Sequence, residues 1–271
     1  VTWGFNNVGT ATSADWLLIM LFYTFEIYFD FSGYSDMAVG VSKMLNITLP
    51  INFDSPYKAV SIRDFWKRWH MSLTKFFTKY VYIPLGGSRK GRLLTYVNTM
   101  IVFLISGLWH GAHWTFILWG FLYGVLMVGE RTFDRKEETV FEPVRWLLTF
   151  CTINILWLLF RSDSITQWKD ILKVIISMQN TNISEGLINT FSLPEIPFLA
   201  NLLHIQTIVG LIRGFGLWFY IILAFGICLV PNNNYNSMEK RSLWTAFLAG
   251  IAFVWGIICL SSESVFVYFN F

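Results

Sequence analysis

The sequence predicts an all-α integral membrane protein built from several packed helices, and two observations carry that prediction. Hydrophobic residues make up 55% of the 271-residue chain and charged residues only 14%, whereas soluble domains carry about 25% charged residues. The apolar residues also gather into long runs, and a helix needs about 20 mainly apolar residues to cross a bilayer. We expect five or six spans or partial spans, at Trp16 to Ile27, Leu93 to Gly129, Trp146 to Phe160, Leu217 to Val230 and Leu243 to Leu260.

The run from Leu93 to Gly129 is too long to be a single spanning helix. It contains no Lys, Arg, Asp or Glu, and as one helix it would be about 55 Å long at 1.5 Å per residue. The hydrocarbon core of a bilayer is only about 30 Å thick. The run must therefore break, and the stretch from Ser106 to Gly111 is the natural place.

A basic segment precedes this run. Nine of the 20 Lys and Arg residues lie between Lys58 and Arg92, with Asp64 as the only acid among them. Short basic loops stay on the cytoplasmic side of a membrane, and their charges attract anionic lipid headgroups. We therefore expect a cytoplasmic loop whose partner is membrane lipid, and no nucleic acid.

Within the basic segment, the stretch "SIRDFWKRWHMSLTKFFTKYVYIPLGG" predicts one amphipathic helix followed by a turn, and Pro84, Gly86 and Gly87 would end the helix. Ser61 is a candidate N-cap. Trp66, His70, Leu73 and Phe77 recur at helical spacing and would share one apolar face. The helix would lie in the membrane interface or pack as a re-entrant element.

Two histidines, His110 and His113, stand inside the uncharged run, and His70 stands on the basic segment. An ionisable group at membrane depth indicates a functional site, and a reference pKa near 6.5 suits a general base. The alternative for His110 is a structural role within a helix bundle, and the alternative for His70 is an amphipathic role at the membrane interface. His110 is favoured because Gly107 and Gly111 beside it permit a break and the close approach of a substrate. His110 and His113 would share a helical face, but zinc needs three or four ligands, so we expect no metal.

Three carboxylates, Glu26, Asp30 and Asp36, lie in or beside the first apolar run. Buried carboxylates need cationic partners or a wet cavity. A structural ion-pair network is favoured over direct catalysis, and the candidate partners are Arg63, Lys67 and Arg68.

Six segments stand out along the chain: "YFDFSGYSDMAVG", "PINFDSPY", "DFWKRWHMSLTKFF", "YIPLGG", "GLWHGAHWTFILWG" and "VFVYFNF". Together they resemble the membrane-bound O-acyltransferase family, and in particular its bacterial alginate O-acetyltransferase-like branch. The resemblance implies a multi-helix transmembrane ring, with re-entrant or interfacial helices, around a funnel. We expect residues 1–271 to form one membrane domain, the C-terminal portion of a protein with further N-terminal spans.

The resemblance also implies roles for individual residues. The essential histidine of the family corresponds to His110, and its second motif histidine corresponds to His70, whereas His113 inherits no role. His110 would act as general base, and His70 would orient the donor or stabilise the oxyanion. We expect substrate-binding or supporting roles for Trp109, Asp36, Trp66, Arg68, Trp69 and Ser72.

The activity implied by the resemblance is transfer of an acyl group, most of all acetyl, from a cytoplasmic thioester donor such as acetyl-CoA. The acceptors would be hydroxyls of an extracellular polysaccharide such as alginate, or a partner transferase; D-alanyl transfer to teichoic acid is the alternative. The chain would be a multi-pass protein of the bacterial inner membrane. Its partners would be a periplasmic or surface SGNH-type acyltransferase and exopolysaccharide export proteins. No cofactor would be permanently bound.

The spacing of the histidines predicts their depths. His110 lies 18 residues beyond Arg92, about 27 Å along a continuous helix, whereas His70 lies within the basic loop. The two imidazoles would then occupy opposite depths of one passage.

A transporter or channel is the alternative from another class, because intramembrane histidines and carboxylates also form proton relays. The sequence lacks the visible internal repeat that many secondary transporters carry, which disfavours this alternative. A structural scaffold for a polysaccharide export machine is a third possibility.

Overall fold

The computed structural model describes residues 1–133, 141–191, 206–230 and 242–259, and over these ranges the chain is helical without β-strands. The predicted all-α architecture is confirmed for this part. The closing segment "VFVYFNF" lies outside the described residues. The helices are α1 (Thr2–Asn6), α2 (Ser13–Met44), α3 (Ile62–Arg68), α4 (Met71–Phe77), α5 (Arg92–His110), α6 (Trp114–Thr132), α7 (Glu142–Arg161), α8 (Ile165–Ser177), α9 (Glu185–Asn189), α11 (Gln206–Leu229) and α13 (Leu243–Cys259).

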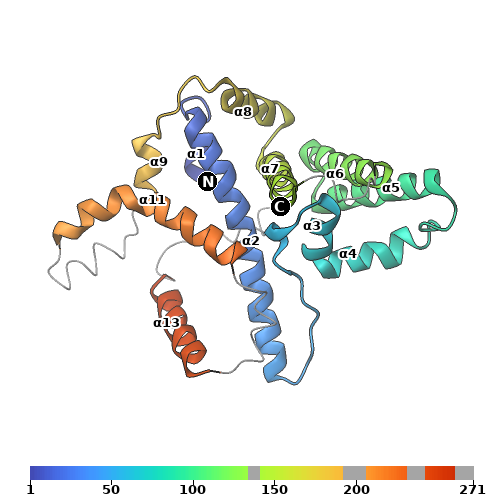
Figure 1. Cartoon of the computed structure of the whole chain (residues 1–271), viewed down its shortest axis with the longest axis horizontal. Helices are drawn as coiled ribbons and strands as arrows, with labels where there is room; N and C mark the ends of the chain where they lie inside the picture. The colour runs from blue at the N-terminus through green and yellow to red at the C-terminus, as the bar shows by residue number, and fades with distance from the viewer. Residues whose placement is uncertain (134–140, 192–205, 231–241, 260–271) are drawn as a thin grey trace.

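The helix α2 is the central column of the structure (Figure 1). It begins with a capping box, in which the Thr12 hydroxyl accepts from the Asp15 N–H and the Asp15 carboxylate accepts from the Thr12 N–H. This reciprocal cap satisfies N–H groups that have no partner within the helix. One side of α2 packs against α7 and α8, and in Figure 1 it separates α9, α11 and α13 from α3 to α6. The predicted run from Trp16 to Ile27 is thus part of a helix of 32 residues.

The long uncharged run folds into a hairpin of α5 and α6, so the predicted break is confirmed. Helix α5 ends at His110, and Gly111 follows with φ of 153°, a conformation that a residue with a Cβ rarely adopts. The two helices approach closely at Gly107 and Gly120. A Cβ added at Gly107 would lie 2.3 Å from the carbonyl oxygen of Phe116. Gly107 therefore permits the close approach of α6 to α5, and not that of a substrate.

Two of the described helices, α5 and α7, have the length and apolar composition needed to cross a membrane. Shorter apolar stretches occupy Gly216–Leu229 of α11 and Leu243–Ile257 of α13. The expected number of five or six spans is therefore met only in part by the described residues.

The basic segment forms two short α-helices, the second of which continues into a π-helical turn at Thr78–Tyr82, so the expectation of one amphipathic helix is wrong. Helix α3 ends at Arg68, and α4 begins at Met71. Between them His70 has a left-handed conformation, with φ of 43° and ψ of 55°. A helix cannot continue through a left-handed residue, so the face expected to carry Trp66 and His70 together is divided.

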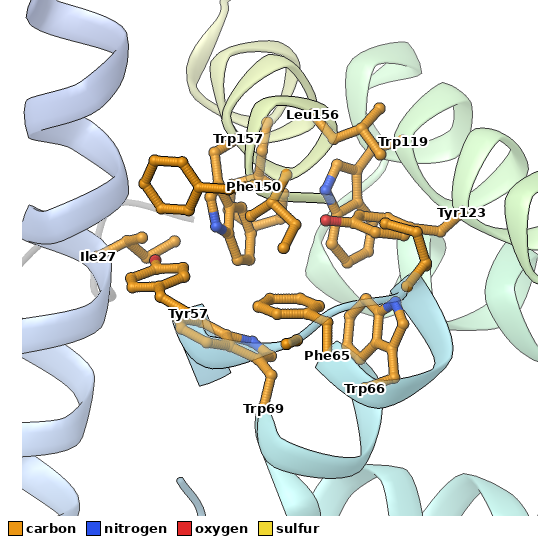
Figure 2. Packing of buried hydrophobic residues seen from close by; sticks show 14 of the residues in the cluster. Ile27, Tyr57, Phe65, Trp66, Trp69, Trp119, Tyr123, Phe150, Leu156 and Trp157 are labelled. Carbon is orange, nitrogen blue, oxygen red and sulfur yellow. The ribbon is translucent and has the colours of Figure 1, made fainter. Parts of the chain in front are cut away.

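The core that holds these helices together is a cluster of aromatic side chains (Figure 2). Trp66 of α3 packs edge-on against Trp119 and Tyr123 of α6, with ring centroids 5.8 Å and 5.0 Å apart. Trp69 approaches Trp157 of α7 at 5.0 Å. Fully burying a large apolar side chain contributes about 1.5–3 kcal/mol, so this cluster anchors the basic segment to α6 and α7.

The close contact within the hairpin predicts the effect of a single methyl group. In Gly120→Ala the new Cβ would lie 2.3 Å from the carbonyl oxygen of Phe103, and overpacking of this kind costs about 1–3 kcal/mol. Gly129→Ala, in the same helix, is the matched control because its Cβ would meet nothing within 4 Å. Thermal unfolding in detergent, followed by tryptophan fluorescence, should show a lower apparent Tm for Gly120→Ala only. Equal Tm values for the two variants would contradict this packing.

Candidate active site

His70 and His110 line one small cavity at the centre of the aromatic cluster. Its volume is about 20 Å³, room for one water-sized group. The walls come from α2, from the α3–α4 segment and from α5, α6 and α7, and they are otherwise apolar. The lining residues are Ile27, Phe31, Trp66, Trp69, His70, Leu73, His110, Trp119, Trp157 and Phe160.

His110 is brought to this cavity by the end of α5. It is the last residue of that helix, and its half-buried ring meets Trp119 and Phe160 edge-on, at centroid distances of 5.4 Å and 5.0 Å. Among the described residues no side chain hydrogen-bonds to its imidazole. Its ring nitrogens are therefore free to exchange a proton with a group that enters the cavity.

The position of His70 is fixed by its left-handed backbone conformation and by its role as the cap of α4. It is the N-cap residue of α4, and its Nδ1 accepts a hydrogen bond of 3.2 Å from the Leu73 N–H. Burial lowers the pKa of His70 to about 4, so the imidazole is neutral at pH 7. Because Nδ1 is the acceptor, the proton of the neutral ring belongs on Nε2. His70 can therefore donate one hydrogen bond.

The expectation that the two histidines lie at opposite depths is wrong. The predicted geometry of α5 is confirmed, since it runs unbroken from Arg92 to His110. The basic segment, however, does not stay at the other end of this helix. Its buried aromatic residues, Trp66 among them, pack into the core and carry His70 to the cavity that His110 lines.

The segment "PINFDSPY" supplies a support that sequence reasoning missed. The carbonyl oxygen of Asn52 accepts from the Met71 N–H at 3.0 Å, and its side-chain oxygen accepts from the Ser72 N–H at 3.1 Å. With the His70 cap, these bonds satisfy the first three N–H groups of α4, which have no partner within the helix. An asparagine in a loop carries no sequence signal that assigns it to a helix about 20 residues further along the chain.

The structure separates the remaining candidate residues. Trp66 and Trp69 line the cavity. Trp109 contacts the His110 ring, at a centroid distance of 4.9 Å, but its side chain is 52% exposed. The exposed Asp36 on α2 and the half-buried Ser72 are not among the described residues that line the cavity.

His113 is separated from His110 by the helix break. It is exposed at the start of α6, with its ring beside Phe116, and it is absent from the described lining of the cavity. Of the paired histidines, only His110 reaches the candidate site.

The expected ion-pair network is not formed by Arg68. The Nε of Arg68 lies 2.9 Å from a carboxylate oxygen of Asp64 in the same helix, and its guanidinium also donates to the carbonyl oxygen of Asp54. Residues four apart on a helix are neighbours, so Arg68 forms its ion pair with Asp64 and not with the carboxylates of α2.

Three tryptophans of the cavity wall carry buried indole N–H groups. Within the described part of the chain, the Nε1 atoms of Trp66, Trp119 and Trp157 have no hydrogen-bond partner. Unpaired buried donors are uncommon and call for an explanation. Such N–H groups could donate hydrogen bonds to a polar group of a ligand or to an ordered water.

Sequence reasoning missed the cavity walls contributed by Trp119, Trp157 and Phe160. These residues stand in apolar runs, where an aromatic side chain facing a cavity has the same sequence signal as one facing lipid or core.

The described ranges contain no group of three His, Cys, Asp or Glu side chains placed to bind a metal ion.

A larger pocket adjoins the histidine cavity and shares Trp66 and Leu73 with it. It has a volume of about 220 Å³, and its wall combines apolar side chains with hydroxyl groups. At Arg131 a guanidinium nitrogen donates to the Tyr82 hydroxyl at 3.1 Å. The other lining residues are Thr74, Phe77, Thr78, Thr99, Val102, Phe103, Ser106 and Met127.

Over its described ranges the chain is helical, and it encloses two histidines in an aromatic-walled cavity. The chain belongs to the membrane-bound O-acyltransferase family, since the family's model matches residues 3–161. That stretch contains both histidines of the cavity.

Individual relatives share different parts of the chain. It is 36% identical to a peptidoglycan O-acetyltransferase of Helicobacter pylori over an alignment of 280 positions, which covers 99% of this chain and 51% of that protein. It is 44% identical to a probable alginate O-acetylase of Pseudomonas fluorescens, over 57% of this chain and 31% of that protein. It is 36% identical to a teichoic acid D-alanyltransferase of Streptococcus thermophilus, over 45% of this chain and 31% of that protein. The chain thus spans about half, or less, of the length of these relatives.

The left-handed cap at His70 predicts different stabilities for two substitutions. His70→Asn keeps a side-chain acceptor for the Leu73 N–H, and asparagine tolerates the left-handed conformation. His70→Val removes the cap and places a branched side chain at φ of 43°, a loss of roughly 2–3 kcal/mol from both effects. Thermal unfolding in detergent should leave His70→Asn close to the unsubstituted protein and lower the Tm of His70→Val. Equal destabilisation by both would contradict the capping role.

Proposed function

We propose that this chain carries the catalytic site of a membrane-bound acyltransferase that moves an acetyl group from a thioester donor to a carbohydrate hydroxyl. The observation that supports this most strongly is the meeting of His70 and His110 at one apolar cavity. Acyl transfer needs a base for the attacking hydroxyl and a donor for the carbonyl oxygen. The two imidazoles offer one of each.

In the proposed reaction His110 accepts the proton of the acceptor hydroxyl as that oxygen attacks the acyl carbonyl carbon. A carbon–oxygen bond forms and negative charge develops on the carbonyl oxygen, which His70 Nε2–H stabilises as a hydrogen-bond donor. The carbon–sulfur bond then breaks, the carbonyl is restored, and His110 returns the proton to the departing sulfur. The imidazole ends in its starting form, so no external acid, base or oxidant is consumed.

The adjoining pocket fits the donor in this proposal. It shares Trp66 with the histidine cavity, so a thioester entering there would place its acyl end towards the two imidazoles. Hydroxyls such as those of Thr74 and Thr99 offer hydrogen bonds to the amides of a pantetheine arm, and Arg131 at the wall offers a positive charge to an anionic donor. Acetyl-CoA is the first donor to test.

The acceptor proposal follows the relatives. The relative named for peptidoglycan matches 99% of this chain, whereas the alginate relative matches 57% and the teichoic acid relative 45%. Peptidoglycan is therefore the first acceptor to test, ahead of the alginate-like polysaccharide expected from sequence motifs. D-alanyl transfer to teichoic acid is the second activity to test.

The remaining parts of the proposal concern the setting of the protein. We place it as a multi-pass protein in the bacterial inner membrane, with the cavity inside a funnel that separates a cytoplasmic donor from an outer acceptor. A periplasmic or surface SGNH-type acyltransferase and exopolysaccharide export proteins are the proposed partners. The nine basic residues between Lys58 and Arg92 support a cytoplasmic side for that segment.

The general-base role predicts a sharp difference between neighbouring histidines. His110→Ala should lower acetyl transfer by about 10²–10⁴-fold, whereas His113→Ala should leave it nearly unchanged because His113 lies outside the cavity. The measurement is transfer of labelled acetyl groups from acetyl-CoA to peptidoglycan in membranes containing the full-length protein. Near-normal transfer by His110→Ala would overturn the assignment, and solute flux without any acyl transfer would favour a transporter.

The donor pocket predicts a specific loss of donor affinity. Val102→Trp places a large ring in a pocket of about 220 Å³ and should raise the KM for acetyl-CoA several-fold, because it removes binding contacts of the donor. Val97→Trp is the matched control, since Val97 is exposed on the same helix. An unchanged KM in Val102→Trp would show that the donor binds elsewhere.

A further inference from the structure

The N-terminus of α3 is capped by a residue that lies far from it in the sequence. The two carboxylate oxygens of Glu130, near the end of α6, accept hydrogen bonds from the backbone N–H groups of Ile62 and Arg63 at 2.6 Å and 2.9 Å. The next N–H, that of Asp64, donates to the Ser61 hydroxyl. All three of the first N–H groups of α3 are thereby satisfied, and two of them depend on one carboxylate.

The charge of Glu130 strengthens this contact. A carboxylate that accepts two N–H groups forms charge-assisted bonds, which are stronger than bonds between neutral groups. It also faces the positive end of the dipole of α3. Glu130 is half-buried, so water competes less for these donors than it would at an open surface.

This contact joins the two elements that carry the histidines. Helix α3 leads directly into His70, and α6 forms the hairpin with α5, which ends at His110. The tie between them combines the packing of Phe65 and Trp66 against α6 with the Glu130 cap. Hydrogen bonds are directional, so two of them to one carboxylate restrict both the position and the rotation of the start of α3.

We propose that Glu130 is a positioning residue of the histidine site, which holds His70 at the working distance from His110 through the N-terminus of α3. The proposal rests on the proposed acyl transfer for its kinetic consequence. The carboxylate touches neither donor nor acceptor, so its removal affects the rate through the placement of His70. Misplacement of a catalytic group by about 1 Å lowers a rate by on the order of 10²-fold.

The kinetic test compares Glu130→Ala, Glu130→Gln and Glu142→Gln in the full-length protein in membranes. Glu130→Ala should lower kcat for acetyl transfer by about 10–100-fold with little change in the KM for acetyl-CoA. Glu130→Gln keeps an amide oxygen for one N–H and should restore part of kcat. Glu142, an exposed glutamate in the first turn of α7, is the matched control, and its substitution should leave kcat unchanged.

A second readout does not depend on catalysis. Diethyl pyrocarbonate modifies accessible imidazoles, and peptide mass spectrometry reports the rate at His70. This rate should rise in Glu130→Ala, rise less in Glu130→Gln and stay unchanged in Glu142→Gln.

The two readouts separate the possible failures. A lower kcat with an unchanged modification rate at His70 would overturn the positioning role, as would unchanged values of both. If the unsubstituted protein transfers no acyl group, the proposed function fails, and the modification rate still decides the placement of His70. Should Glu130→Ala not fold, as judged by its gel-filtration profile in detergent, the comparison of Glu130→Gln with Glu142→Gln decides in the same way.

Discussion

The packing of Trp66 against Trp119 and Tyr123 is the contact on which the rest of the site depends. The three side chains are almost fully buried, and aromatic pairs of this geometry contribute about 0.5–1.5 kcal/mol each beyond their burial. The contact packs the short helices of the basic segment against α6. With Trp66 packed there, His70 lines the same cavity as His110 at the end of α5.

The left-handed conformation of His70 sets the angle between α3 and α4 and so fixes the direction of the His70 side chain. A non-glycine residue in that conformation costs roughly 1–2 kcal/mol, and strain of this kind persists only where the surroundings over-determine it. Two contacts hold the turn at His70. The Leu73 N–H donates to the His70 ring, and the Ser72 N–H at the start of α4 donates to the Asn52 side chain. The same imidazole therefore stabilises the turn with Nδ1 and is left with Nε2–H for chemistry.

The sequence predicted one of the two helix breaks near the site and missed the other. The break near Gly111 followed from length alone, because a bilayer limits the length of a helix. The break at His70 could not be predicted, because the spacing from Trp66 to Phe77 fits a continuous helix and a histidine carries no left-handed preference strong enough to signal the turn.

The same limit applies to the site. The histidines were accessible to sequence reasoning because an imidazole is unusual in an apolar setting. The walls contributed by Trp119 and Phe160 were not, since aromatic residues are common throughout the apolar runs. The supports from Asn52 and Glu130 were also hidden, because each acts on backbone groups that are remote in sequence, and backbone groups carry no sequence signal.

The central claim is that His70 and His110 act as a unit in one cavity, and a double-mutant cycle on acyl transfer tests it most directly. Rates would be compared for His70→Asn, His110→Ala and the double variant, with His70→Asn chosen because it preserves the cap. Groups that act as a unit give strongly non-additive losses, so the account predicts a double variant about as slow as the slower single variant. Losses that multiply, as they do for independent sites, would contradict it.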